Sequence, residues 1–247
     1  MITKGEFKMK KKLAGSIIAA SFLVIAAGCG PFFNGNDDSK TVLIEKDKAD
    51  ELVLELNIGA GELRVDGGAN EWAEGTIEYT NNKLTPDITY KLKDDKGIAV
   101  IEQDDGIFKN LNIGDMKNTW NLKLNNDIPL DLKVNAGASE TYLDLKGLQM
   151  NDLEVNAGVG DMTIDMSGNF DESFDATLHM GVGDSTIILP KDVGVKINSA
   201  NGIGKTDYDG FISNGNGIYV NEAYEDAKVV INVNTELGVG KVTFKIE

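Results

Sequence analysis

Three pairs of adjacent aspartates are the side chains of this sequence best suited to acid–base chemistry: Asp37-Asp38, Asp94-Asp95 and Asp104-Asp105. Glycosidase-type hydrolysis needs two carboxyl groups held across a cleft in different environments, so that one stays protonated while the other ionises. All three pairs lie in polar linkers or turns, where nothing desolvates one carboxyl group. We interpret them as solvated turn residues, and we predict no catalytic residues and no enzymatic activity.

Residues that could hold a metal or a cofactor are scarce. The 247 residues include one cysteine and one histidine, which excludes zinc sites built from several thiolates and most histidine-based sites. The segment Gly158-Val159-Gly160-Asp161 resembles the calcium-binding nonapeptide repeat, but its acid comes one position early and the double glycine is missing. No glycine-rich segment leads from a strand into a helix, which excludes a phosphate loop. We predict neither a metal site nor a cofactor, and calcium binding by the acidic turns stays open.

The first 28 residues have the pattern of an export signal. Three lysines at 10–12 precede an apolar run at 13–27, and this run is shorter than the ~20 residues that cross a bilayer. A basic segment, a short apolar segment and small residues at its end are typical of a secretory signal peptide. We predict a signal peptide over residues 1–28, and Met9, directly before the lysines, is as good a start as Met1.

The single cysteine stands at the end of this signal. Ala26-Ala27-Gly28-Cys29 resembles a bacterial lipobox. In a lipobox the cysteine thiol receives a diacylglyceryl group, and the cysteine becomes the mature N-terminus. We therefore predict a lipoprotein that is acylated at Cys29 with palmitate-type chains and anchored to the extracytoplasmic face of the cell membrane. A polar tether is expected at residues 29–40.

The chain is strongly acidic, with 40 Asp and Glu against 24 Lys and Arg and a net charge of −16. The signal peptide carries five lysines and one glutamate, so its removal makes the net charge −20. Such a body repels anionic lipid and the phosphates of nucleic acids, so nucleic acid is excluded as a partner and the acyl chains must hold the protein at the membrane. We expect the partner to be an unknown envelope protein or a cationic molecule, bound more weakly at high salt.

A short glycine-containing motif recurs along the chain. Each copy reads Gly, a small apolar residue, Gly or Ser, and a charged residue, and an alternating strand pattern follows. The copies begin at Gly59, Gly137, Gly158, Gly181, Gly202 and Gly238. Three successive intervals of 21, 23 and 21 residues indicate a solenoid, in which each repeat packs on its neighbours. We predict an all-β fold of short stacked strands, with glycines at the corners and the apolar residue between them pointing inward.

Two further columns follow from this alignment of the repeats. Two positions before the first glycine stand Asn57, Asn135, Asn156, His179, Ala200 and Glu236. Three asparagines in register predict a ladder of stacked amides. We expect His179 to be a ladder member hydrogen-bonded to the backbone, and a catalytic or ligand-binding histidine is the alternative. The charged position after the glycines predicts a column that turns from acidic to basic: Glu62, Glu140, Asp161, Asp184, Lys205 and Lys241.

The last interval is longer, at 36 residues, and residues 210–226 supply the excess. Asn214-Gly215-Asn216-Gly217 lies there between two apolar segments, which predicts a protruding hairpin. Tyr219 and Tyr224 in this insertion are our candidates for an interaction surface. The alternative is that both tyrosines cover the core or a sheet edge.

The segment Leu54 to Val65, the Gly67-Gly68 turn and the strand pattern Glu74 to Tyr79 resemble the N-terminal domain of the bacterial toast-rack family. The repeats from Leu132 onward resemble that family's C-terminal part. They also resemble the domain of cell-wall-active antibiotic response proteins and of head-domain adhesins. The resemblance covers roughly residues 50–247. It implies a right-handed, parallel β-helix-like solenoid of short strands, with repeats of about 22 residues.

We divide the mature body into a toast-rack N-terminal β domain at 41–128 and a β-solenoid domain at 129–247. The resemblance implies a non-enzymatic, membrane-anchored module of the cell envelope that acts in binding, interaction or stress response. The alternative is a carbohydrate-binding adhesin, or a β-helix enzyme acting on envelope polysaccharide. Such lyases pair basic residues with acids. The only arginine, Arg64, lies in the first strand unit rather than on a shared solenoid face, which weighs against the enzyme.

Overall fold

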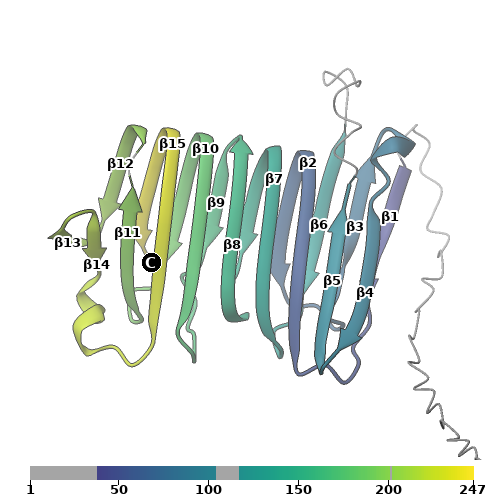
Figure 1. Ribbon diagram of the computed structural model, residues 1–247, viewed down its shortest axis with the longest axis horizontal. Helices are drawn as coiled ribbons and strands as arrows, with labels where there is room; N and C mark the ends of the chain where they lie inside the picture. The colour runs from purple at the N-terminus through teal and green to yellow at the C-terminus, as the bar shows by residue number, and fades with distance from the viewer. Residues whose placement is uncertain (1–37, 104–116, 201) are drawn as a thin grey trace, which may run out of the picture.

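The computed structural model describes residues 38–103, 117–200 and 202–247 (Figure 1). These residues form a single 15-stranded sheet with two short 3₁₀ turns, η1 (Asn82–Leu84) and η4 (Glu222–Asp226). The strands are β1 (Asp38–Ile44), β2 (Glu51–Gly67), β3 (Ala73–Tyr79), β4 (Asp87–Lys93), β5 (Lys96–Glu102), β6 (Asn118–Leu124), β7 (Pro129–Asp144), β8 (Gln149–Val159), β9 (Met162–Asp165), β10 (Phe174–Leu189), β11 (Gly194–Ala200), β12 (Ile203–Asp209), β13 (Ile212–Gly215), β14 (Ile218–Val220) and β15 (Val230–Ile246). No helix within these ranges is long or apolar enough to span a bilayer.

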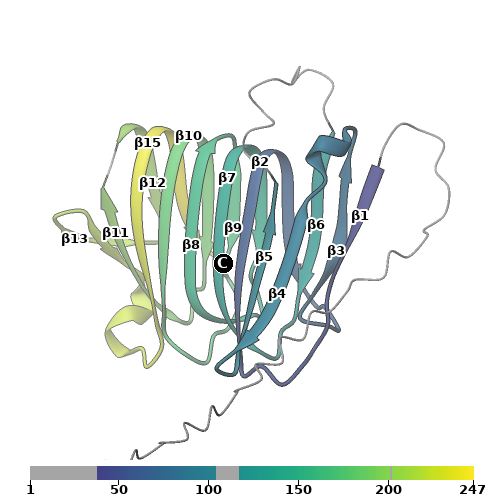
Figure 2. The ribbon, with the colours of Figure 1, turned by 45° about the vertical axis from the view of Figure 1, so that its right-hand side comes forward.

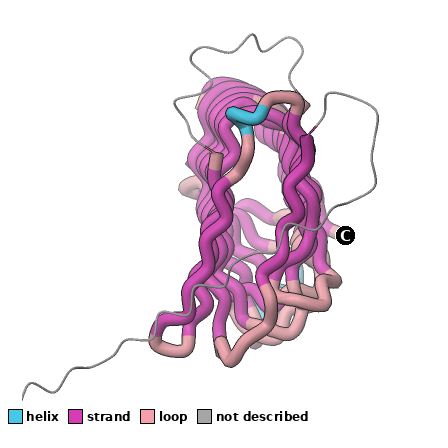
Figure 3. The backbone as a smooth tube through the Cα atoms, turned by 90° about the vertical axis from the view of Figure 1, so that its right-hand side faces the viewer, coloured by secondary structure: helices cyan, strands magenta, loops and turns pink. Residues whose placement is uncertain are grey.

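The long strands are arches. The first half of β2 pairs with β5 and its second half pairs with β6, because the strand bends between them at Gly59 to Gly61. β7, β10 and β15 bend at the same motif, and the arches β8–β9 and β11–β12 are divided there into two strands. Figure 3 shows the result: two walls of strands meet at a common crest, and loops close the opposite edge, the base. We call the wall of the first halves the first wall and the other the second wall.

The core lies between the two walls. Along β2 buried and partly exposed residues alternate, as expected for a strand with one face inside. Leu52, Leu54, Leu56 and Ile58 point inward and are at most 2% exposed. The residues between them face solvent on the outer side of the first wall. Each arch therefore buries its apolar face only against the opposite wall and the arches beside it.

Neighbouring arches are parallel and in register. Asn57 pairs with Asn135, Asn135 with Asn156, and Asn156 with His179, so the repeats aligned in the sequence are aligned in space. The prediction of an all-β, parallel, solenoid-like stack is confirmed.

The order of the arches in space differs from their order in the chain. β15, the last strand, lies between β10 and the β11–β12 arch and pairs in parallel with both (Figure 1). A sequential solenoid would place β11–β12 directly on β10. The spacing of the motif along the chain could not reveal this exchange, because the motif aligns equally well with either neighbour.

The residues after β12 extend the first wall. β13 and β14 form a hairpin at residues 212–220, inside the predicted insertion 210–226, and β14 pairs antiparallel with β11. The turn of the hairpin contains Asn216 at φ 52° and Gly217 at φ 77°, the left-handed conformations that a tight hairpin turn needs. The first wall is therefore two strands longer than the second wall at this end, where β12 is the last strand (Figure 2).

At the opposite end, β4 continues the first wall, and β6, β3 and β1 continue the second. β1 begins at Asp38, which pairs with Tyr79, so the last three residues of the predicted tether belong to a strand. The signal peptide, Cys29 and the rest of the tether lie outside the described residues. The predicted domain boundary after residue 128 falls between β6 and β7, and β2 pairs with β7 across it.

Candidate interaction surface

An exposed row of apolar side chains follows the crest. In every arch, one residue lies between the first and third positions of the glycine motif. Strand register aligns these residues along the crest in the spatial order Ala60, Ala138, Val159, Val182, Val239 and Ile203. Val159, Val182 and Val239 are about half exposed, and Ile203 is 77% exposed. We call these last four residues the crest row. The prediction that this position points inward is wrong for them and for Ala138; only Ala60 is buried.

The crest glycines explain why these side chains point outward. Gly183 has φ +143°, and a Cβ atom on it would lie 2.1 Å from the carbonyl oxygen of Gly160 in the next arch. Gly181 is equally close to the carbonyl oxygen of Gly158. Because the arches touch backbone to backbone on both sides of Val182, the bend has room for that side chain only on its convex, outer side.

A charged row borders the crest on the second wall. In spatial order it reads Glu62, Glu140, Asp161, Asp184, Lys241 and Lys205. The backbone N–H of Asp184 donates to the Asp161 carboxylate at 3.0 Å, and that of Lys241 donates to the Asp184 carboxylate at 3.2 Å. The acidic end of the row therefore lies toward β2 and the basic end toward β12. Within the described ranges, no group of three or more His, Cys, Asp or Glu side chains is arranged to hold a metal ion.

The predicted amide ladder borders the crest on the first wall. The Asn135 amide donates to Asn57 Oδ1 at 2.6 Å, and the Asn156 amide donates to Asn135 Oδ1 at 2.9 Å. His179 continues the row, and its Nδ1 lies 3.2 Å from a carboxylate oxygen of Glu236, a side-chain contact where a backbone contact was expected. Three asparagines, a histidine and a glutamate thus stand on five consecutive arches.

Two grooves follow this row. One, of about 840 Å³, is bordered by Asn57, Asn135 and Asn156 and by the carboxylates of Asp87 and Glu102. The other, of about 480 Å³, shares Asn156 and continues past His179 to Glu236. Five crest glycines line the two grooves: Gly59, Gly137, Gly158, Gly181 and Gly238. We call the combined feature the polar trough.

Three aspartates of neighbouring arches stack on the outer face of the first wall, nearer the base. They are Asp131, Asp152 and Asp175. Burial and the neighbouring Glu51 carboxyl raise the pKa of Asp131 to about 6, and burial together with the charge of Asp175 raises the pKa of Asp152. These three aspartates do not line the polar trough. Sequence reasoning missed this row, because no motif marks it and only the arch register brings it together.

The two candidate tyrosines have different positions. The Tyr219 ring stacks on Tyr208 with centroids 3.5 Å apart, and Tyr208 stacks on Phe244 at 5.2 Å. This stack connects β14 of the first wall to β12 and β15 of the second, so Tyr219 covers the end of the core, while the proposed role in binding a partner stays a prediction. Tyr224 lies in η4, partly exposed, and its backbone hydrogen-bonds within that turn.

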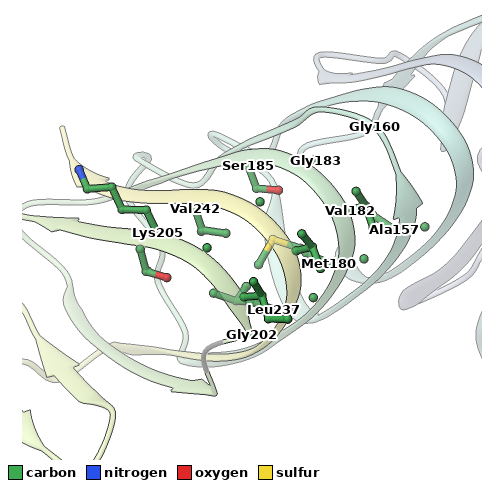
Figure 4. Close-up of a pocket in the computed structure, with 18 of the residues that line it drawn as sticks. Ala157, Gly160, Met180, Val182, Gly183, Ser185, Gly202, Lys205, Leu237 and Val242 are labelled. Carbon is green, nitrogen blue, oxygen red and sulfur yellow. The ribbon is translucent and has the colours of Figure 1, made fainter.

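A cavity of about 210 Å³ lies beneath the crest near this stack (Figure 4). Met180, Ser185 and Val242 are among the buried side chains that line it, together with crest glycines, Tyr208 and Tyr219. Ser185 of β10 occupies the inward position that Leu63 occupies in β2 and Met162 occupies in β9. The smaller side chain accounts for part of the space.

The acid pairs of the sequence do not form a site. Asp94 and Asp95 form the turn between β4 and β5, at φ 51° and 65°, as the turn interpretation expected. Asp38 lies in β1, whereas Asp37 and the pair Asp104-Asp105 are outside the described residues.

The comparisons with known proteins agree with this architecture. The family model of the N-terminal domain of toast-rack proteins (DUF2154) matches residues 33–188, well over half of the chain. The chain belongs to the toast-rack family. The model of the C-terminal domain of the cell wall-active antibiotics response protein LiaF matches residues 139–244, which adds the later arches of this toast-rack protein to the match.

Solved structures extend the comparison. A "putative cell adhesion protein" from Clostridium sporogenes is 34% identical, covers 85% of this chain and all of its own, and superposes with a TM-score of 0.83. Adhesin-named structures from Parabacteroides merdae and Bacteroides fragilis are 14% and 12% identical over 87% and 84% of this chain and 97% and 96% of their own. Their TM-scores are 0.28 and 0.21, too low to support a structural comparison. No curated protein matches the chain. Neither matched family nor these relatives are named for an enzymatic activity.

Proposed function

We propose that this toast-rack protein is a non-enzymatic interaction module of the bacterial cell envelope, of the adhesion or stress-response type. The observation that carries the proposal is the crest row. Six large apolar residues of the described chain are exposed, and four of them stand side by side on the crest. A contiguous exposed apolar feature with charged residues on its flank is typical of a protein–partner surface. The matches to a LiaF domain and to an adhesion-named relative support this class of function.

A crosslinking experiment in cells tests this proposal. Val182→Asp places a charge in the middle of the crest row, and Thr186→Asp places the same charge on the outer face of the same strand, four residues down the second wall. We expect the wild type and Thr186→Asp to crosslink to the same envelope partner and Val182→Asp to lose it. Identical crosslinked partners for the wild type and both variants would contradict the proposal.

We infer that the module is held at the membrane by acylation of Cys29. The lipobox-like segment supports this, as does the match to the membrane-associated LiaF family. Cys29→Ser removes the acceptor thiol, so we expect the protein to move from the detergent phase to the aqueous phase in a detergent-partitioning assay and to lose incorporated palmitate. Unchanged partitioning of the variant would contradict lipid anchoring.

A further inference from the structure

We propose that the polar trough binds an extended, uncharged, hydroxyl-rich glycan that lies along the stack of arches. This inference rests on the proposed function, since it names the ligand class of an envelope-binding surface. It is carried by three properties of the trough: its hydrogen-bonding chemistry, its repeat distance and its amphipathic cross-section.

The hydrogen bonds of the ladder show what kind of ligand can bind. The Asn135 amide donates to Glu55 and Asn57, and the Asn156 amide donates to Glu154 and Asn135, so both donors of these two amides are used. The ladder thus leaves carbonyl lone pairs for a ligand, and the trough adds the carboxylates of Asp87, Glu102 and Glu236. A surface in which acceptors predominate binds a ligand that donates, as sugar hydroxyls do.

The charge of the trough selects among such ligands. Hydrogen bonds from Asn156 and from Lys133 lower the pKa of Glu154, which therefore stays ionised beside the ladder. With the three trough carboxylates, this makes the surface repel polyanions. A neutral glycan is accepted, and a uronate or phosphate polymer is not.

The repeat distance separates a glycan from an extended peptide. Neighbouring parallel strands are ~4.8 Å apart, so the trough presents one polar side chain per ~4.8 Å over five arches. A β-1,4-linked hexose polymer advances by one ring, a similar distance, per residue. Alternate rings are turned over, but both edges of each ring carry polar substituents, so every ring can present a hydrogen-bonding edge to one arch. An extended peptide presents side chains to one face only every ~6.7 Å and loses register within two arches.

The cross-section of the trough suits the two faces of a sugar ring. The amides of β2, β7 and β8 stand on one side, with bare glycine backbone next to them and the crest residues Ala60, Ala138 and Val159 beyond it. On β10 and β15, Val182 and Val239 stand beside His179 and Glu236 instead. Hydroxyl groups at the ring edge can reach the amide carbonyls while the C–H face contacts the apolar row. The amides are already fixed by the ladder, so binding costs little side-chain entropy.

Calorimetric titration of the intact chain with chito- and cello-oligosaccharides of two to eight sugars tests the inference. We expect at least a ~10-fold gain in affinity between the disaccharide and the pentasaccharide, followed by a plateau, because the trough ends after five arches. Oligogalacturonate of the same length should not bind. Affinity that does not depend on length, preferred binding of the anionic oligomer or of a proline-rich decapeptide, or no binding of any glycan would overturn the inference.

Matched variants locate the site. Asn156→Ala removes the middle residue of the five-arch polar row and should weaken pentasaccharide binding at least ~10-fold. Asn232→Ala removes a comparable bond, from its amide to the Asp175 carboxylate at 2.9 Å on the same wall, and should leave affinity within about twofold. If Asn156→Ala does not fold, His179→Ala, at a half-exposed position, replaces it. Equal effects of trough and control variants would contradict the placement.

If envelope crosslinking through the crest row persists while glycans do not bind, only this inference fails and the proposed function stands.

Discussion

At Gly183 a single methyl group has a large predicted effect. Alanine there would combine a strained φ with a clash against the Gly160 carbonyl oxygen, and that oxygen belongs to backbone that cannot move without shifting an arch. We expect Gly183→Ala to lower the free energy of unfolding by about 3–5 kcal/mol, from strain plus overpacking. Gly68 also has positive φ, but nothing lies within 4 Å of its Cβ position, so Gly68→Ala should cost only about 1 kcal/mol. Equal losses in urea unfolding would show that arch contact is not the cause.

Asp131 gives the stability a specific pH dependence. Its pKa is raised to about 6 by burial and by Glu51, so the folded state holds the proton more tightly than the unfolded state, whose carboxyl titrates near ~4. The stabilisation that the protonated Asp131 gives to the folded state is therefore fully present below pH ~4 and is lost as the pH rises through about 6. We expect Asp131→Asn to be more stable than the wild type at pH 7 by about 1 kcal/mol after solvent screening, with the difference vanishing near pH 4. Urea unfolding from pH 4 to 8 measures this, with the exposed Asp192→Asn as the charge control. A pH-independent difference would refute it.

At the scale of elements, the stack of Tyr219, Tyr208 and Phe244 is what closes the end of the core. Tyr208→Leu and Tyr219→Leu should each destabilise the protein, and the double variant should lose less than their sum by about 1 kcal/mol, the coupling of a stacked aromatic pair. Ile212→Ala, at a 59% exposed position on the same hairpin, should change stability by less than ~0.5 kcal/mol. Strictly additive losses at the two tyrosines would mean that the rings do not stabilise each other.

The same elements show how far the sequence could predict the structure. Alternating strands and the Gly-x-Gly repeat were sufficient for the stacked arches, and the aligned asparagines were sufficient for the ladder, because both follow from local periodicity. The outward crest row was not predictable from alternation, since backbone contact at Gly181 and Gly183 decides the direction of Val182. The row of Asp131, Asp152 and Asp175 and the hydrogen bonds of the trough could not be predicted from the sequence, because both depend on how separate arches are aligned. β1 was missed because Asp38 to Lys40 are polar residues on an edge strand, paired only with β3.

At the scale of the whole molecule, the position of β15 makes the C-terminal end of the stack depend on the last strand of the chain. A sequential solenoid adds arches one after another, but here the β11–β12 arch has no parallel partner until the last 17-residue strand has entered between it and β10. β15 should therefore control the whole C-terminal end, including the hairpin that pairs with β11. Damage to it should spread in both directions along the stack.

Val233→Pro tests this dependence, because Val233 is fully buried and pairs with Ala176 of β10 and Ile197 of β11. Proline in a central strand removes a ladder hydrogen bond, and for this reason it is found essentially only on edge strands or at bulges. We expect hydrogen exchange to accelerate in β10, β11 and β14 together, while β2 and β7 stay protected. Ser213→Pro, on the outermost strand β13, should accelerate exchange only in its own hairpin. If Val233→Pro instead left β11 and β14 protected, β11 would have to hold its place without β15, and the exchanged order of the arches would be wrong.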